Sequence, residues 1–129
     1  MVLLDTSALV ASLSEARRGW PDLRRLIEGG AIVRLSSIVL YEWRRGPRTP
    51  GELEIQRQIF PDAEAIPFGW EEAVLSAKLY RSLPRSHARA ADFAIAACAL
   101  RHDAALWTLN PADFADIPGL RLSAPASFC

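Results

Sequence analysis

The sequence is poor in cysteine and lysine, and each shortage excludes certain classes of protein. The two cysteines, Cys98 inside an apolar run and Cys129 at the end, offer neither a disulfide framework nor a CxxC spacing for a metal. This usage favours a reducing, cytoplasmic location. The single lysine, Lys78, lies in an expected helix. A response-regulator receiver domain is therefore excluded, because it would need a lysine near its last strand.

Long hydrophobic runs are also missing. No apolar stretch is long enough to cross a bilayer, and Met1 is followed by Val-Leu-Leu-Asp with no basic segment ahead of an apolar leader. We therefore expect a soluble, unprocessed protein with no membrane partner. The chain has 129 residues, half of them hydrophobic, which is enough for one core and too few for two. Residues 1–129 are expected to form a single domain.

Basic residues show no excess, since fifteen of them balance fifteen acids. This balance at first argues against a nucleic-acid partner. The argument weakens if several acids gather around bound cations, because the remaining charge is then basic. Fourteen of the basic residues are arginine, which suits bidentate contacts to phosphate, although an arginine-biased genome would give the same count. A phosphate-bearing substrate is compatible with this composition.

Apolar runs alternate with helical patterns along the chain. Strands are expected at residues 2–4, 31–35, 105–108 and 120–122, with a weak candidate at 65–67, and helices at 8–13, 22–28, 38–45, 52–60, 70–83 and 90–101. In the helix at 70–83, the residues at helical spacing are Trp70, Ala73, Val74, Ala77 and Tyr80. Strands that alternate with helices predict an α/β sandwich with a mainly parallel central sheet.

Four acids are expected to converge on one edge of this sheet. Asp5 directly follows the first strand, and Asp113 follows the strand that ends near Thr108. Glu42 lies in the helix that leaves the second strand, and Asp92 lies in the first turn of the helix at 90–101. Ligands bind beyond the carboxyl ends of the strands in open parallel sheets. The four acids are therefore candidate catalytic residues.

Each acid also has an ordinary structural interpretation. Asp5 could cap its helix, and Asp92 could stabilise the dipole of a helix first turn. Glu42 could pair with an arginine on the same helix, and Asp113 could be a turn residue. Their joint placement favours the site, because clustered carboxylates repel unless cations hold them. Oxygen ligands without His or Cys suit Mg²⁺ or Mn²⁺, and such ions activate water for phosphodiester hydrolysis.

Four spaced segments resemble the motifs of PIN-domain ribonucleases, and in particular of VapC toxins from toxin–antitoxin pairs. They are LLDTSAL at residues 3–9, SSIVLYE at 36–42, ADFAIAA at 91–97 and TLNPADF at 108–114. The similarity runs in order over nearly the whole chain. It implies a PIN-like α/β/α sandwich, Mg²⁺ or Mn²⁺ dependence, cleavage of an RNA substrate, a homodimer and inhibition by a cognate antitoxin protein.

The resemblance also assigns roles to residues. It implies that Asp5, Glu42, Asp92 and Asp113 are catalytic and that three of them, Asp5, Asp92 and Asp113, hold the metal. Small polar residues match the positions that support these ligands, namely Thr6, Ser7, Thr108 and Asn110. The fourth acid stays open, because Asp116 lies close to Asp113 and the family varies there.

Some residues are candidates for contacts outside the acids. Arg81, Arg85 and Arg89 precede Asp92 and could form a rim that binds RNA phosphates, or simply a solvated basic loop. Four tryptophans in so short a chain favour core or interface roles over base stacking, and they are Trp20, Trp43, Trp70 and Trp107.

Two other functions compete with a ribonuclease. A haloacid-dehalogenase-type phosphatase would want a second aspartate two residues after Asp5, and this sequence has Ser7 there. A non-catalytic PIN-like module that binds RNA or protein is the remaining alternative. All four acids are present, which favours the enzyme, and a metal-dependent cleavage assay separates the two.

Overall fold

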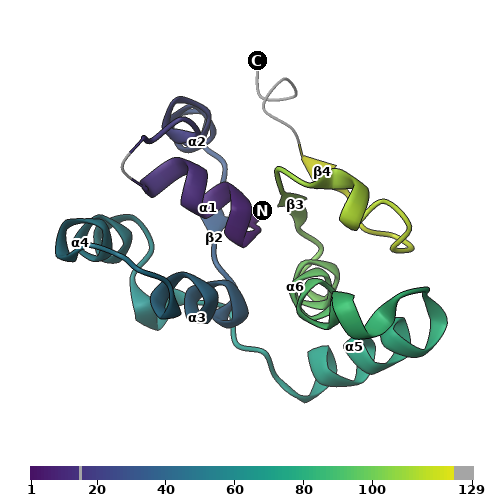
Figure 1. Ribbon diagram of the computed structural model, residues 1–129. Helices are drawn as coiled ribbons and strands as arrows, with labels where there is room; N and C mark the ends of the chain where they lie inside the picture. The colour runs from purple at the N-terminus through teal and green to yellow at the C-terminus, as the bar shows by residue number, and fades with distance from the viewer. Residues whose placement is uncertain (15, 124–129) are drawn as a thin grey trace.

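The structure is a computed structural model that describes residues 1–14 and 16–123. A parallel sheet with strand order β2-β1-β3-β4 forms its centre (Figure 1). The strands are β1 (Val2–Leu4), β2 (Val33–Arg34), β3 (Ala105–Trp107) and β4 (Leu122–Ser123). Cys129 lies outside the described residues. The mainly parallel sheet expected from the sequence is confirmed.

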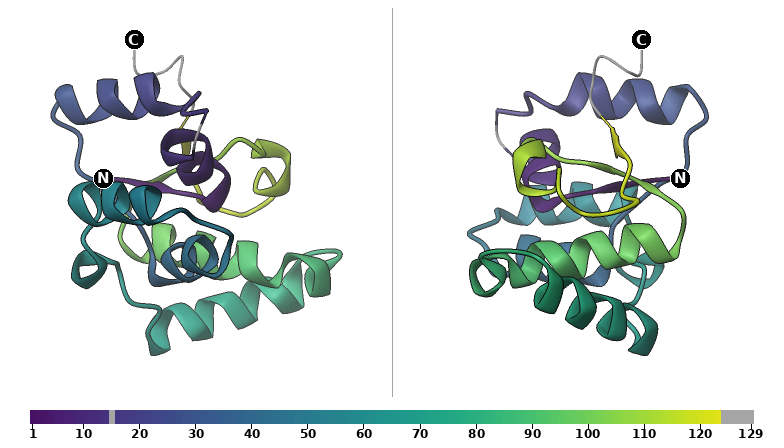
Figure 2. Two further views of the ribbon diagram at one scale, coloured as in Figure 1. Left: turned by 60° about the vertical axis from the view of Figure 1, so that its left-hand side comes forward. Right: turned by 90° about the vertical axis from the view of Figure 1, so that its right-hand side faces the viewer.

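Helices lie on both sides of this sheet. They are α1 (Thr6–Leu13), α2 (Trp20–Glu28), α3 (Ser37–Arg45), α4 (Pro50–Ile59), α5 (Trp70–Ser82) and α6 (Ala90–Arg101), with short 3-10 turns η1 (Asp62–Glu64), η2 (Ser86–Arg89) and η3 (Pro111–Asp113). Figure 2 shows α2 on one side of β1, and α6 on the other side between the sheet and α5. This arrangement is the predicted α/β sandwich.

Burial explains why the central elements are apolar throughout. Leu3 and Leu4 of β1 are both buried, because neighbours cover the strand on each face of the sheet. In α6 every residue from Phe93 to Ala99 is buried, since the helix lies between the sheet and α5. A helix enclosed in this way has no polar face, and its small alanines allow close packing on both sides.

Capping residues set where several helices begin. Ser36 precedes α3, and its hydroxyl accepts a hydrogen bond from the Val39 amide at 3.2 Å. Thr49 precedes α4 and forms a reciprocal capping box with Glu52. Gly30 ends α2 with a positive φ of 89°, a conformation that glycine adopts without strain. These turns agree with the boundaries expected from the sequence.

Two expectations differ from the structure. The weak strand candidate at 65–67 makes only an isolated parallel bridge between Ile66 and Ser36. In α5 the apolar residues at helical spacing face solvent, and Trp70 and Val74 are 76% and 64% exposed. The helix packs on α6 through another side, where Leu79 is buried. Apolar spacing identified the helix but not the face that covers the core.

The other tryptophans and the described cysteine behave as expected for core residues. Trp43 and Trp107 are fully buried, and Trp20 is half-buried. Cys98 is also buried, and this burial raises the pKa of its thiol to about 12. Such a thiol stays protonated and unreactive at neutral pH. Among the described residues, no helix has the length and apolar character needed to span a membrane.

Candidate active site

Asp5 lies where β1 and β3 end side by side. Leu4 pairs with Trp107 across the parallel ladder, so the next residues, Asp5 and Thr108, leave the sheet at the same edge. The Asp5 amide donates to the Trp107 carbonyl at 2.8 Å, which extends the ladder by one step. Asp5 is only 6% exposed. Its carboxylate is therefore fixed by the sheet and not by a flexible loop.

Two hydroxyls hold the Asp5 carboxylate. Ser7 Oγ donates to Asp5 Oδ2 at 2.9 Å, and Thr108 Oγ1 donates to the same oxygen at 2.8 Å. Both hydroxyls also accept from the backbone, Ser7 from the Leu109 amide and Thr108 from the Asn110 amide, each at 3.0 Å. Each hydroxyl proton is thus directed at the carboxylate, because the backbone amides occupy the acceptor side.

This hydrogen bonding tests the interpretation that Asp5 only caps helix α1. The residue occupies the N-cap position of α1, yet within the described chain its side chain makes no capping hydrogen bond. Oδ2 is turned toward Ser7 and Thr108 instead. The capping interpretation of Asp5 is therefore wrong. Ser7 and Thr108 orient the acid as expected of supporting residues, whereas Asn110 contributes its backbone amide.

Glu42 projects from α3 and makes two side-chain contacts, one of which is the expected pairing with an arginine on the same helix. Thr6 Oγ1 donates to Glu42 Oε1 at 2.5 Å, which joins the start of α1 to α3. Arg45, on the same helix, lies 3.6 Å from Glu42 Oε2. The Glu42 side chain is 18% exposed, while that of Arg45 is 59% exposed and solvent screens it. The contact with Thr6 is the shorter one and points to the supporting role expected for that residue.

The pKa of Asp92, in the first turn of α6, responds to the charges of the other three acids. Burial raises the pKa of its carboxyl to about 6, and the negative charges of Asp5, Asp113 and Glu42 add to this rise, while Arg89 opposes it. A helix N-terminus would by itself favour the charged form. The repulsion from three carboxylates therefore places Asp92 within one acidic cluster, defined here as Asp5, Glu42, Asp92 and Asp113.

Asp113 and Asp116, the two candidates for the fourth acid, have different surroundings. Asp113 is exposed in η3, and its charge raises the pKa of Asp92. Asp116 instead receives two hydrogen bonds from the Arg89 guanidinium, at 2.5 and 3.0 Å, and this pairing lowers the pKa of Asp116. Asp116 is thus neutralised by its own partner. Asp113 is the acid that belongs to the cluster.

The arginines expected to bind RNA fall into two groups. Arg81 and Arg85 are exposed and remain candidates for phosphate contacts. Arg89 has a side chain that is only 9% exposed, because it is paired with Asp116 and stacked 4.8 Å from the Phe93 ring. The expectation that Arg89 forms part of a solvent-facing rim is therefore wrong. Its separation of 27 residues from Asp116 gave no sequence signal for this pair.

The donor set suits a hard divalent cation, although the cluster is not a preformed cage. All its ligands would be carboxylate oxygens, which favour Mg²⁺ or Mn²⁺ over zinc. Burial is the main cause of the raised pKa of Asp92, and the charges of Asp5, Asp113 and Glu42 raise it further against the opposing effect of Arg89. Within the described residues, no three acids, histidines or cysteines stand so that they could hold a metal ion between them. The residues fit by charge and chemistry, and an ion would have to draw the carboxylates together.

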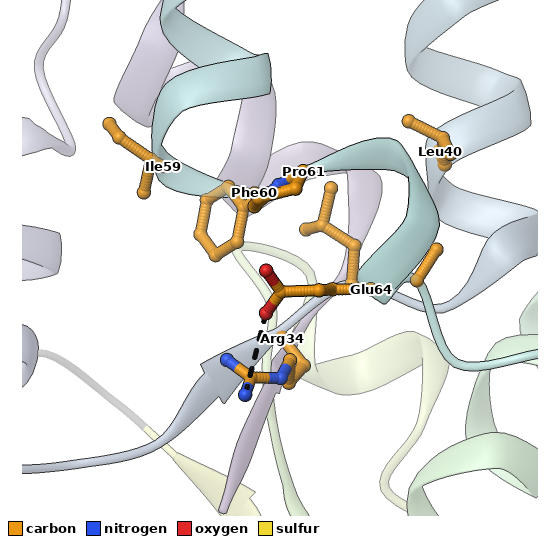
Figure 3. A pocket seen from close by; sticks show the side chains of 8 residues that line it. Arg34, Leu40, Ile59, Phe60, Pro61 and Glu64 are labelled. Atoms are coloured by element: carbon orange, nitrogen blue, oxygen red, sulfur yellow. Dashed lines mark ion pairs between the residues drawn. The ribbon is translucent and has the colours of Figure 1, made fainter.

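Three hollows of the described surface lie away from this cluster, around α2, β2 and α4. The cavity in Figure 3 is closed by the Arg34–Glu64 ion pair at 3.6 Å and has a volume of only about 10 Å³, room for a single water molecule. A larger apolar hollow of about 520 Å³ lies between α2 and the end of α4. Another, of about 270 Å³, adjoins it and shares Trp20 and Ile59. We call these two hollows together the α2–α4 groove.

Comparison with known proteins agrees with this fold. The sequence profile of the PIN domain matches residues 2–120. The chain belongs to the PIN-domain family. This match spans the first strand, all four acids of the cluster and the turn η3. No curated protein sequence matches the chain.

Solved structures with the PIN fold include three toxin–antitoxin complexes. DNA-bound VapBC from Salmonella typhimurium superposes with a TM-score of 0.77 at 21% identity, covering 99% of this chain and 98% of that one. VapBC2 from Rickettsia felis, bound to a promoter DNA fragment, gives 0.72 at 22% identity, covering 95% and 98%. FitAcB from Neisseria gonorrhoeae gives 0.71 at 27% identity, covering 98% and 99%. The fold therefore extends over nearly the full length of these PIN-domain chains.

Proposed function

We propose that this PIN-domain protein is a metal-dependent endoribonuclease and the toxin of a toxin–antitoxin pair. The observation that carries the proposal is the acidic cluster near the carboxyl ends of β1 and β3, where burial and, after it, the charges of three other carboxylates raise the pKa of Asp92 to about 6. Folding gathers this negative charge at the edge of a parallel sheet where ligands usually bind. Such a cluster is costly unless a ligand cation neutralises it.

The proposed cofactor is Mg²⁺ or Mn²⁺, held by Asp5, Asp92 and Asp113. When bound, such an ion lowers the pKa of water and stabilises negative charge on a phosphate. Asp5 offers Oδ1, because Ser7 and Thr108 hold Oδ2. Asp92 must lose its proton to bind, and Asp113 closes the cluster from the exposed side. Glu42 is held by Thr6 and completes the catalytic set.

The proposed substrate is RNA, whose phosphates would otherwise be repelled by the four carboxylates. The proposed phosphate contacts are two exposed arginines, Arg81 near the end of α5 and Arg85 directly before η2. The proposal is tested by incubating the purified protein with single-stranded RNA in Mn²⁺ or Mg²⁺. Cleavage should be lost in EDTA, and the products should carry 5′-phosphates, because water attacks the phosphorus in this chemistry. Products with 2′,3′-cyclic phosphates would overturn the mechanism. Absence of cleavage would instead favour the alternative function, a non-catalytic PIN-like module that binds RNA or protein.

We propose that an antitoxin segment with an apolar face binds in the α2–α4 groove. The solved PIN-domain structures with this fold are complexes with partner proteins. The groove is lined mainly by apolar side chains, and Ile27 and Ile32 are 41% and 55% exposed. Large exposed apolar residues beside a hollow are typical of a protein interface. A partner that covers Ile27 and Ile32 would bury apolar surface that the folded chain itself leaves exposed.

The exposed side of α5 supports the proposed homodimer. Trp70, Val74 and Tyr80 leave an apolar stripe on this helix in solvent. The helix starts with Glu71, which pairs with Arg101 of α6 but keeps a side chain that is 44% exposed, and it ends with Lys78 and Arg81. Two copies that pack α5 in antiparallel orientation about a two-fold axis would cover both stripes and bring acidic ends next to basic ends. This charge pattern favours a second copy as the occupant.

A further inference from the structure

Arg89 holds together three parts of the chain near the acidic cluster. Its Nη1 donates to the Pro84 carbonyl at 3.2 Å and to Asp116 Oδ2 at 3.0 Å. Its Nη2 donates to Asp116 Oδ1 at 2.5 Å and to the Asp113 carbonyl at 3.0 Å. The guanidinium therefore binds the connection before η2 and the turn that carries Asp113. It does so from the position directly before α6.

The orientation of this guanidinium is fixed by more than the ion pair. It lies 4.8 Å from the ring of Phe93, a buried residue of α6 that directly follows Asp92. The flat guanidinium and the ring stack, while the edge of the guanidinium faces the carboxylate and the two carbonyls. A lysine in the same place would keep the charge but could not bind a carboxylate in two places and a carbonyl at fixed angles.

Asp113 depends on this contact more than the other acids depend on theirs. The sheet and two hydroxyls hold Asp5, and α6 carries Asp92, whereas Asp113 lies in a short exposed turn. Local hydrogen bonds close that turn, and Phe114 anchors it in the core. The contact from Arg89 to the Asp113 carbonyl is a direct link between this turn and the start of α6.

From this geometry we infer that Arg89 is a positioning residue that sets the placement of Asp113 relative to Asp92, with Asp116 holding its guanidinium. The inference rests on the proposed function, because it concerns two proposed metal ligands. Arg89 touches neither the substrate nor the metal in this role. It acts through the backbone of the turn, and its loss should weaken metal binding without removing a ligand.

The test compares Arg89→Lys and Asp116→Ala with wild type in two measurements. Calorimetric titration with Mn²⁺ gives the metal affinity, and RNA cleavage is followed from low to saturating Mn²⁺. A matched control is Arg121→Lys, because Arg121 also donates to a backbone carbonyl and a carboxylate, both of Asp103, but far from the cluster. Asp116 has a side chain that is 43% exposed, so its truncation leaves no cavity in the core, and melting curves of both variants show which of them remain folded for the comparison.

The expected result is a Mn²⁺ affinity about 10- to 100-fold weaker in both variants, with cleavage largely restored at saturating Mn²⁺ and no change in the control. Variants that melt at a lower temperature but bind Mn²⁺ as wild type does would overturn the positioning role. Loss of binding in Asp116→Ala that excess Mn²⁺ does not restore would also overturn it, since Asp116 would then be a ligand. Wild type that neither binds Mn²⁺ nor cleaves RNA would instead refute the proposed function.

Discussion

Thr108 donates a hydrogen bond of 2.8 Å to Asp5 across 103 residues of sequence. The contact exists because β1 and β3 are parallel neighbours that end in register, so the residues after each strand face the same edge. Ser7 makes the equivalent contact from the first turn of α1. One carboxylate oxygen is thus held by two separate parts of the chain, and the other oxygen is left for a ligand.

Replacing Thr108 by valine should lower cleavage at limiting Mn²⁺ about 10- to 100-fold, because Asp5 loses one of the two hydroxyls that orient it. Thr108→Ser keeps the hydroxyl and should stay close to wild type. Thr49→Val is the stability control, since it removes the cap of α4 and should cost about 1 kcal/mol without changing metal affinity. Equal Mn²⁺ affinity in Thr108→Val and wild type would show that Asp5 does not depend on this contact.

Asp92→Asn should lower cleavage by orders of magnitude while leaving the metal-free fold at least as stable. The change removes a charge that three other carboxylates repel, which offsets a helix-dipole loss of about 0.3–1 kcal/mol. Mn²⁺ should raise the melting temperature of wild type more than that of the variant. The control is Asp22→Asn, in the first turn of α2 beside Arg25. Normal cleavage and a normal response to Mn²⁺ in Asp92→Asn would remove Asp92 from the site.

The raised pKa of Asp92 also predicts a pH dependence of stability without metal. A carboxyl whose folded pKa is about 6, above its ordinary value of 3.8, binds its proton more tightly in the folded protein. Its contribution to stability is therefore greatest in acid and declines as the pH rises from about 4 to about 6. Urea unfolding of wild type and Asp92→Asn across this range isolates the effect. A difference between the two that does not change with pH would contradict the raised pKa.

Val74→Glu should shift the protein from dimer to monomer, because it places a charge in the apolar stripe of α5, where Val74 is 64% exposed. Light scattering at micromolar concentration measures this directly. The fold should be unaffected, since the side chain has no role in the core. A wild-type protein that is already monomeric under these conditions would refute the dimer through α5.

Ile32→Glu should weaken binding of the antitoxin while leaving RNA cleavage and the dimer intact, since Ile32 lines the α2–α4 groove and is 55% exposed. Co-purification with the product of an adjacent small reading frame, followed by titration, measures the affinity. Val74→Glu is the control for this experiment, and Ile32→Glu is the control for the dimer. An antitoxin that binds both variants equally would place its interface elsewhere.

The parts of the fold that could be predicted are those with local causes. The apolar run before Asp5 predicted β1, and Ser36 and Gly30 marked helix ends, because strand burial and capping depend on neighbouring residues. The rule for parallel sheets predicted that the acids approach the same edge, and the structure places Asp5 at the carboxyl end of β1. The choice between Asp113 and Asp116 could not be made, because both lie in the segment that follows β3. Only the three-dimensional pairing of Asp116 with Arg89 separates them.

The side of α5 that packs on the core could not be predicted from the sequence. Helical spacing showed that Trp70 and Val74 share a side of the helix, but spacing does not show which side packs on α6. That outcome depends on tertiary packing, which buries Leu79 of α5 and leaves Trp70 and Val74 exposed. Tertiary packing of this kind has no local signal, which is why the apolar stripe was found only in the structure.

The position of β1 in the sheet has a consequence for synthesis. The strand made first lies between β2 and β3, and its partner residues in β3 are translated about a hundred residues later. While the ribosome is still elongating the chain, Asp5 has no Thr108 hydroxyl to orient it, and neither α6 nor η3 is present to supply Asp92 and Asp113. A growing chain therefore has no assembled acidic cluster, and the ribosome that makes it is not exposed to the proposed nuclease until α6, β3 and η3 have been made.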